Sequence, residues 1–467
     1  MPHADSHGVD ARRGISRLAV GCAAAVAFAA PAVVAAPSVF PTGTTIYDPA
    51  QAYSGYTVLS PLGTQAAIVI DMNGNVVKQW DGYNTSAGGP ARVLPGGEIV
   101  ASVGARPGHL EALELVQRDF DGNVVWRFAH NVEIETQDGK TSWALRQHHD
   151  WQRSDFPAGY YSPDAAPSAT GAKTLILTHV DHALPDVAGD ALLQDDRLIE
   201  ISWDGKILWE WTAGEHIGEL GLSDEARAAI KAAPRPNARA GFDWLHLNAA
   251  AYVGPNQWYD EGDRRFAPDN VVISSREASI IAIVARDGSI VWRLGPDYRA
   301  SKELRAIGQI IGQHNAHIIP KGLPGAGNLL VFDNGGASGY GYANPIAPNS
   351  VGALVRPSSR VLEIDPVKLE LVWSYQAPGQ FFATNISGAQ RLPNGNTLIT
   401  EGPDGRVFEV TRSGAIVWEY VNPLAAGPRA SNAVYRAYRL PYAWIPQLER
   451  PQERAVTPPA RAEFRVP

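Results

Sequence analysis

A short pattern of apolar and polar positions recurs along the chain. Each copy has a turn with Gly or Asp, two or three apolar residues and then a tryptophan, as in DGNVVW at 121–126 and DGSIVW at 287–292. The gaps between successive tryptophans are 46, 83, 83, 81 and 45 residues. The short gaps match one propeller blade, and the long gaps match a blade with an insertion. The six tryptophans of the repeat are Trp80, Trp126, Trp209, Trp292, Trp373 and Trp418.

Each tryptophan ends a longer unit of alternating residues. Strand-like runs precede it, such as RLIEI at 197–201 and RVLEI at 360–364, and the Asp-Gly turns are typical of β-hairpins. Each unit is therefore a small antiparallel sheet with an aromatic residue on its outer strand. The sequence predicts an all-β fold, a six-bladed β-propeller with loop and short-helix insertions on the middle blades.

The two ends of the chain are predicted to complete one blade together. The first unit, residues 56–80, lacks an innermost strand, whereas the strand-like run at 433–438 has no tryptophan repeat after it. The insertions precede Trp209, Trp292 and Trp373. Two of them contain predicted helices, at 223–233 and 301–311, and Ser223 begins the first as its N-cap. Insertions on consecutive blades are expected to form a wall over one end of the channel.

The three blades with insertions begin with related polar sequences, QHHDW at 147–151, LHLNA at 245–249 and QHNAH at 313–317. The first strand of a propeller blade lines the channel. Strand side chains alternate between two faces, so one funnel is predicted to receive His148, Asp150, His246, Asn248 and His314. Arg276 ends the second strand of the middle blade at the same mouth.

A single strand histidine is more often a buried, hydrogen-bonded residue than a functional one. Three at equivalent positions beside an arginine favour a site. The guanidinium of Arg276 would repel a divalent cation but suits a tetrahedral oxyanion, so we expect an anion site with no metal and no cofactor. The aspartates at 181, 186, 190, 195 and 196 are interpreted as solvated loop residues, and a structural calcium among them stays open.

Composition and the N-terminal segment limit the partners and the location. The net charge of −8 offers no basic surface for nucleic acid. Residues 1–36 are interpreted as a cleaved signal peptide: Arg12-Arg13 and Arg17 precede an Ala-rich apolar run that is too short for a stable membrane anchor. We expect a periplasmic or secreted protein, exported by the general or the twin-arginine route. Cys22 is the only cysteine, so residues 37–467 have no thiol chemistry.

The segments QHHD, DWLHLN (243–248), SSRE (274–277) and GQHNAH (312–317) occur in this order on a six-unit tryptophan repeat. In this the chain resembles the bacterial aryl sulfate sulfotransferases over nearly all of residues 37–467. The resemblance implies an exported enzyme that moves a sulfuryl group from an aryl sulfate donor to a phenolic acceptor. It also implies a ping-pong mechanism through a sulfohistidine, independent of adenosine phosphosulfate.

Carried over by motif, His314 is the nucleophile, and His246, Asn248 and Arg276 bind the sulfuryl oxygens. The remaining polar partner is His148 or His149. Strand alternation favours His148, and a register shift of one residue would exchange the two. His317 is expected to face away from the channel. The chain has no room for the N-terminal β-domain of longer members and lacks their cysteine pair. Some members dimerise, which leaves a homodimer open here.

Two other classes of function compete with this interpretation. The tryptophan repeat also occurs in quinone-cofactor dehydrogenases, which usually have more blades and an acidic calcium site, and in scaffold propellers. A scaffold propeller would need no histidine cluster in its channel. The main alternative is a non-catalytic binding propeller, in which replacing His314 leaves every activity unchanged. The transferase needs a water-excluding wall, and the candidate aromatic residues for it are Trp143, Trp151, Phe242, Trp244, Tyr340, Phe381 and Phe382.

Overall fold

The computed structural model describes residues 42–458, except for residues 86–88, 136–138, 233–242, 337, 339–353 and 426–430. The predicted signal peptide, residues 1–36, lies outside the described residues. Phe242 and Tyr340 of the predicted aromatic wall also lie outside them.

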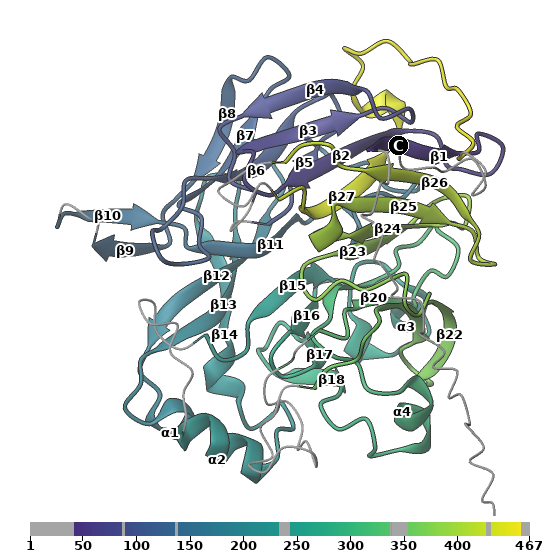
Figure 1. Cartoon of the computed structure of the whole chain (residues 1–467). Helices are drawn as coiled ribbons and strands as arrows, with labels where there is room; N and C mark the ends of the chain where they lie inside the picture. The colour runs from purple at the N-terminus through teal and green to yellow at the C-terminus, as the bar shows by residue number, and fades with distance from the viewer. Residues whose placement is uncertain are drawn as a thin grey trace, which may run out of the picture. The chain divides into compact units, whose positions relative to one another are not determined.

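Six antiparallel sheets form the blades of a six-bladed β-propeller, as predicted (Figure 1). The strands of each blade follow from the innermost to the outermost. Blade 1 contains β27 (Val434–Leu440), β2 (Tyr56–Pro61), β3 (Ala66–Ile70) and β4 (Val76–Asp81). Blade 2 contains β5 (Arg92–Val93), β6 (Ile99–Val103), β7 (Glu114–Arg118) and β8 (Val124–Phe128). Blade 3 contains β11 (Gln147–Arg153), β12 (Thr174–His182), β13 (Leu193–Ile201) and β14 (Ile207–Thr212).

The second half of the ring repeats this order. Blade 4 contains β15 (Leu247–Tyr252), β16 (Val271–Ser275), β17 (Ile280–Val284) and β18 (Ile290–Leu294). Blade 5 contains β19 (His314–Ile318), β20 (Leu329–Asp333), β21 (Arg360–Asp365) and β22 (Glu370–Tyr375). Blade 6 contains β23 (Gly388–Arg391), β24 (Thr397–Glu401), β25 (Arg406–Val410), β26 (Ile416–Val421) and an added outer strand, β1 (Gly43–Tyr47).

The remaining elements are short. A hairpin of β9 (Val132–Glu135) and β10 (Thr141–Ala144) stands apart from the blades. The α-helices are α1 (Pro185–Ala188), α2 (Asp224–Ala232), α3 (Gln257–Asp260) and α4 (Lys302–Ile307). The 3-10 helices are η1 (Ala213–His216), η2 (Arg264–Phe266), η3 (Gly402–Asp404) and η4 (Tyr442–Trp444).

Blade 1 joins the two ends of the described chain, which confirms the predicted closure. β27 pairs antiparallel with β2 from Tyr56 opposite Leu440 to Pro61 opposite Val434. In Figure 1 the yellow-green β27 lies beside the purple β2. β1 adds a second link, because it pairs with β26 of blade 6. The sequence pattern did not predict this strand. The ring is therefore closed by strand pairing rather than by packing alone.

The six repeat tryptophans lie on the fourth strand of each blade, counted from the channel, and link each blade to the next. Every indole N–H donates a hydrogen bond to a backbone carbonyl in the turn between the third and fourth strands of the following blade. The pairs are Trp80 with Asp119 (3.0 Å), Trp126 with Trp203 (2.8 Å), Trp209 with Arg286 (3.0 Å), Trp292 with Pro366 (2.9 Å), Trp373 with Arg412 (2.8 Å) and Trp418 with Met72 (2.8 Å). The last pair joins blade 6 to blade 1, so this chain of hydrogen bonds runs round the whole ring.

Both predicted helices form, with the expected caps. The Ser223 hydroxyl accepts a hydrogen bond from the Ala226 N–H before α2, and the Ser301 hydroxyl accepts one from the Leu304 N–H before α4. α4 is shorter than predicted, because Gly308 adopts a φ of 75° and ends it at Ile307.

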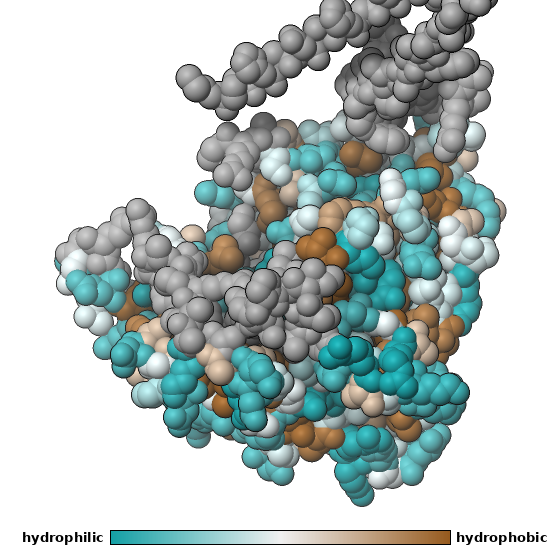
Figure 2. Space-filling view, turned by 60° about the horizontal axis from the view of Figure 1, so that its bottom comes forward, coloured by the Kyte–Doolittle hydropathy of each residue, from teal (hydrophilic) through white to brown (hydrophobic). Residues whose placement is uncertain are grey.

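The face shown in Figure 2 has hydrophobic side chains scattered among hydrophilic ones. Exposed apolar residues on the outermost strands include Val76 on β4, Val124 on β8 and Leu208 on β14. Among the described residues, no helix combines the length and the apolar character that crossing a bilayer requires.

Replacing the ring-closing tryptophan is expected to destabilise the fold far more than replacing its neighbour. The Trp418 side chain is fully buried, whereas Trp373 is partly exposed although both make the same hydrogen bond. We expect Trp418→Ala to lower the free energy of unfolding by roughly 3–5 kcal/mol, as for large buried aromatics. Trp373→Ala is the matched control, and its smaller burial predicts a clearly smaller loss. Denaturant unfolding of both variants measures the difference, and equal losses would contradict a special role for ring closure.

Candidate active site

The predicted site residues lie where the innermost strands of blades 3, 4 and 5 begin, and neighbouring innermost strands there are in contact. A non-glycine residue with positive φ interrupts each strand start: His149 (56°), His246 (51°) and Asn315 (55°). The pairing register shifts at or beside each of these positions. Such bulges change which face the following side chains occupy. The simple alternation assumed from the sequence therefore fails at the site.

The His314 ring is held at one nitrogen. It is buried on β19, with Nδ1 2.7 Å from Asn334 Oδ1 and 3.1 Å from the Gly312 carbonyl oxygen. The Asn334 amide nitrogen donates to the carbonyls of Ala383 and Ile386, which fixes the amide with its oxygen toward His314. Both atoms facing Nδ1 are acceptors, so Nδ1 carries the proton. The neutral ring then has its lone pair on Nε2, and no described residue hydrogen-bonds that atom.

Burial is the main influence on the pKa of His314 and lowers it well below its ordinary value. The hydrogen bond to Asn334 counteracts this in part, while the positive charges of Arg276, His246 and Arg436 lower the pKa further. A free histidine titrates near 6.5, so His314 is neutral at pH 7. The geometry and the charges thus both give a nucleophilic Nε2.

His246 has the opposite character. Burial alone would lower its pKa, but the attraction of Asp243 outweighs burial and the net pKa is raised. Asp243 Oδ2 lies 2.6 Å from His246 Nδ1. The pKa of Asp243 is held far below its usual range despite burial, mainly by His246. Asp243 therefore favours the proton-carrying form of His246, whereas burial favours the neutral form of His314.

The sequence favoured His148 as the histidine beside His246, and this orientation is wrong. The His149 ring packs edge-on against His246 with centroids 4.5 Å apart, and His314 is among the titratable groups that act on it. His148 instead stacks on His179, with ring centroids 3.6 Å apart. The bulge at His149 exchanges the two residues, as the register-shift alternative allowed.

Arg276 and Asn248 lie where the sequence placed them. The Arg276 backbone N–H donates to the His246 carbonyl (3.2 Å), and its side chain, about a quarter exposed, pairs with Glu277. Asn248 is fully buried, and its amide nitrogen donates to the Gln313 carbonyl (2.7 Å), which ties blade 4 to the start of β19. The structure thus brings together His314, His246, His149, Arg276 and Asn248.

His317 was expected to face away from the channel, and this is also wrong. The step of three positions from His314 to His317 lies opposite a step of only two positions on β20, from Phe332 to Leu330. The two histidines therefore share a face. Burial lowers the pKa of His317 to about 4, and Arg436, Asp150 and Arg92 also act on it. Asp150 itself lies between two arginines, 3.0 Å from Arg92 and 3.5 Å from Arg436. These residues fill the channel deeper than His314.

Three residues of the site were not predicted as such. Asp243 lies inside the DWLHLN motif, and its spacing of three from His246 is the signal that could have found it. Arg436 lies in the innermost strand β27 and acts on His314 across the channel. Asn334 follows β20, and no local pattern distinguishes it from an ordinary loop asparagine. Asn334 and Arg436 act across the fold, whereas Asp243 acts on a neighbour along the chain.

The predicted aromatic wall is only partly exposed. Trp151, Trp244 and Phe381 are buried in the core, whereas Trp143 and Phe382 are exposed by 45% and 37%. The prediction that Asp195 and Asp196 are solvated loop residues is wrong, since both are fully buried in β13. A cavity of about 600 Å³ lies at the opposite ends of β11, β15 and β19, lined in part by Phe156, Tyr252, Pro255 and Lys321, and is separate from the histidine site.

The fold and the cluster define a six-bladed propeller with a histidine-lined channel mouth. The profile of the arylsulfotransferase (ASST) family matches residues 114–423, more than half of the chain, so the chain belongs to this family. Membership supports an arylsulfotransferase function in general, with small-molecule substrates.

A search of curated proteins found no match. Similar solved structures include a protein of unknown function from Bacteroides caccae (11% identity, 83% of this chain and 98% of that one, TM-score 0.40). Others are virginiamycin B lyase from Staphylococcus aureus (11%, 74% and 73%, 0.30) and a europium-containing methanol dehydrogenase (13%, 79% and 67%, 0.34). At these scores the likenesses carry no weight for function.

The tautomer of His314 is directly measurable. We expect nitrogen NMR of protein labelled with ¹⁵N-histidine to show a neutral ring protonated on Nδ1 at pH 7, because both groups facing Nδ1 are acceptors. His314→Gln assigns the signal by removing it. A ring protonated on Nε2 would contradict the assignment of the nucleophilic atom.

Proposed function

We propose that the protein is an exported aryl sulfate sulfotransferase that uses a sulfohistidine intermediate and no adenosine phosphosulfate. The observation that carries the proposal is the His314 ring, neutral, anchored through Nδ1 by Asn334 and carrying its lone pair on Nε2. Family membership supports the general reaction, and the resemblance in the site motifs supports its sulfohistidine form.

The first step transfers the sulfuryl group to the protein. His314 Nε2 attacks the sulfur of the aryl sulfate, an N–S bond forms, and the S–O bond to the aryl group breaks with its electron pair left on oxygen. The leaving phenolate has a conjugate acid with a pKa near 10, and His246 supplies its proton. Arg276 and the Asn248 amide donate hydrogen bonds to the sulfuryl oxygens, whose charge grows in the transition state.

The second step reverses the first with a new phenol. His246, now neutral, accepts the proton of the acceptor phenol, whose oxygen attacks sulfur, and the S–N bond breaks with its electron pair returned to Nε2. No oxidant, reductant or metal takes part in either step. His149, beside His246 and charge-coupled to His314, is the remaining polar partner in place of His148.

Acceptor-dependent release of phenol tests the proposal. With a chromogenic aryl sulfate, we expect release only when an acceptor phenol is present, and loss of at least about 1,000-fold in His314→Ala because the covalent step is removed. Mass spectrometry of the enzyme treated with donor alone is expected to find sulfonation on His314.

His130→Ala is the control, since this histidine stacks on the exposed Trp143, and it is expected to keep full activity. Equal release with and without acceptor would identify a hydrolase instead. Ligand binding without any turnover, unchanged in His314→Ala, would favour the alternative of a non-catalytic binding propeller.

Asn334→Asp is expected to shift the pH dependence of kcat. The groups facing His314 are Asn334, Arg276, His246, Arg436 and His149. A carboxylate in place of the Asn334 amide favours the imidazolium, so the pKa of His314 rises and the nucleophile is protonated at higher pH. The acid limb of the kcat profile therefore moves to higher pH than in the wild type.

Asn334→Ala distinguishes the effect of a negative charge beside His314 from the loss of the hydrogen bond that holds its ring. It removes the acceptor without adding a charge, so we expect kcat to fall about ten-fold, which corresponds to one lost hydrogen bond of about 1.4 kcal/mol, while the acid limb does not move up. If neither variant changed kcat or its pH profile, Asn334 would have no role in positioning the nucleophile.

A further inference from the structure

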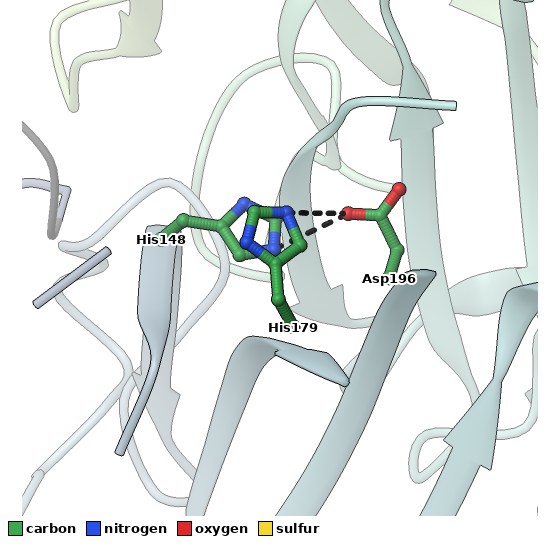
Figure 3. A group of neighbouring side chains, drawn as sticks. All are labelled: His148, His179 and Asp196. Carbon is green, nitrogen blue, oxygen red and sulfur yellow. Dashed lines mark ion pairs between the residues drawn. The ribbon is translucent and has the colours of Figure 1, made fainter. Parts of the chain in front are cut away.

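Three buried side chains in blade 3 point unsatisfied polar atoms at one another (Figure 3). They are His148 on β11, His179 on β12 and Asp196 on β13, each at most 1% exposed. His148 Nε2, His179 Nε2 and Asp196 Oδ1 have no hydrogen-bond partner. Leaving buried polar groups without a hydrogen bond is unfavourable. The sequence predicted no metal, but these three atoms meet one another only in ion-pair contacts that lack hydrogen-bond geometry.

We propose that His148, His179 and Asp196 bind a divalent transition-metal ion of the zinc type. The Asp196 Oδ1 atom lies 3.2 Å from His148 Nε2 and 3.7 Å from His179 Nε2, and the three ligand atoms all lie within 4.8 Å of one another. Neighbouring ligands of a tetrahedral zinc ion with bonds of about 2.0–2.2 Å are about 3.3–3.6 Å apart. The distances from Asp196 to the two histidines are thus close to those between zinc ligands, so an ion can bind with little movement of Asp196.

The surrounding residues hold these ligands by their other atoms. His179 Nδ1 faces the Glu111 carboxylate at 3.1 Å and the Gln194 amide nitrogen at 2.7 Å. A proton on Nδ1, donated to Glu111, leaves the lone pair of His179 on Nε2. The Leu247 N–H donates to Asp196 Oδ2 (3.0 Å), so Oδ1 remains for an ion. His148 Nδ1 is 2.9 Å from His149 Nδ1. A carboxylate behind a ligating histidine is a common support of protein metal sites.

One movement is required for the ion to bind. The rings of His148 and His179 are stacked 3.6 Å apart at an angle of 11°, whereas a shared metal lies near the plane of each ring. At least one ring must therefore rotate until both Nε2 lone pairs point at the ion. The Thr178 carbonyl also attracts the His148 ring, but it leaves Nε2 without a satisfying hydrogen bond.

The ligand set selects the kind of ion. Two imidazoles and one carboxylate suit Zn²⁺ and its neighbours, whereas Ca²⁺ and Mg²⁺ prefer oxygen ligands alone. A second carboxylate, Asp243, acts electrostatically on all three ligands, and its Oδ1 is also buried and unpaired. Complete burial indicates a structural site rather than one that exchanges substrates.

Metal content of the full chain tests the proposal. The protein is produced with zinc in the medium and its metal is measured by elemental analysis, and a chelator-treated portion is titrated with Co²⁺. We expect one ion per chain and the visible absorption of Co²⁺ in a low-symmetry site. Asp196→Asn and His179→Gln are each expected to weaken binding by about 100-fold or more, since each removes a direct ligand. His216→Gln, which alters a histidine paired with Glu219 outside the cluster, is the matched control and keeps full binding.

Thermal unfolding gives an independent readout. Zinc is expected to raise the Tm of the chelator-treated wild type and of His216→Gln, but not that of the ligand variants, because only a bound ion stabilises the folded state. A wild type that carries no metal and takes up neither Zn²⁺ nor Co²⁺ would overturn the proposal, as would full binding by both ligand variants. If Asp196→Asn fails to fold, His179→Gln decides the outcome alone.

Discussion

The closure of the ring is the constraint on which the rest of the structure depends. His149, His246 and His314 come from blades 3, 4 and 5, and Arg436 reaches them from blade 1. No two of these residues are local to each other along the chain, so only the angular spacing of the blades brings them together. The tryptophan hydrogen bonds set that spacing at the outer rim, and the pairing of β27 with β2 closes it at the channel. A small change in blade angle at the rim would open the distances at the site.

The fold was predictable because its signals are local and repeated. A hairpin turn, an apolar pair and a tryptophan recur six times. Each copy marks the same position in its blade, so a copy with a weak pattern can be interpreted from the others. The strand that completes blade 1 was found from what was missing in the first unit. The start of α2 was predicted from Ser223, whose hydroxyl makes the expected cap, and the hydroxyl of Ser301 caps α4 in the same way. β1 was missed, because it adds to the edge of a blade that was already complete.

The orientation of the site residues was less predictable, for one physical reason. His149, His246 and Asn315 adopt positive φ. This conformation is unfavourable for residues other than glycine, and without a glycine the sequence does not indicate it. Each such residue breaks the alternation of the strand around it, so His148, just before His149, and His317, just after Asn315 and Ala316, were assigned to the wrong sides. Asn334 and Asp195 illustrate a second limit of prediction from sequence. Asn334 follows a strand and Asp195 stands in a polar run, so neither is expected to be buried. Only the pairing between strands and blades shows that both are.

The opposite protonation of His314 and His246 follows from what each ring meets at Nδ1. His314 faces the oxygen of a neutral amide, which orients the ring without attracting a proton strongly, and burial then keeps the ring neutral. His246 faces the carboxylate of Asp243, whose charge overcomes the effect of burial on its pKa. Exchanging the amide and the carboxylate would exchange the roles of nucleophile and acid. Asp243 also lies between the site and the buried cluster of blade 3, since one of its oxygens holds His246 while its charge acts on His148, His179 and Asp196. A single carboxylate thereby connects the protonated histidine of the channel to the core of the neighbouring blade.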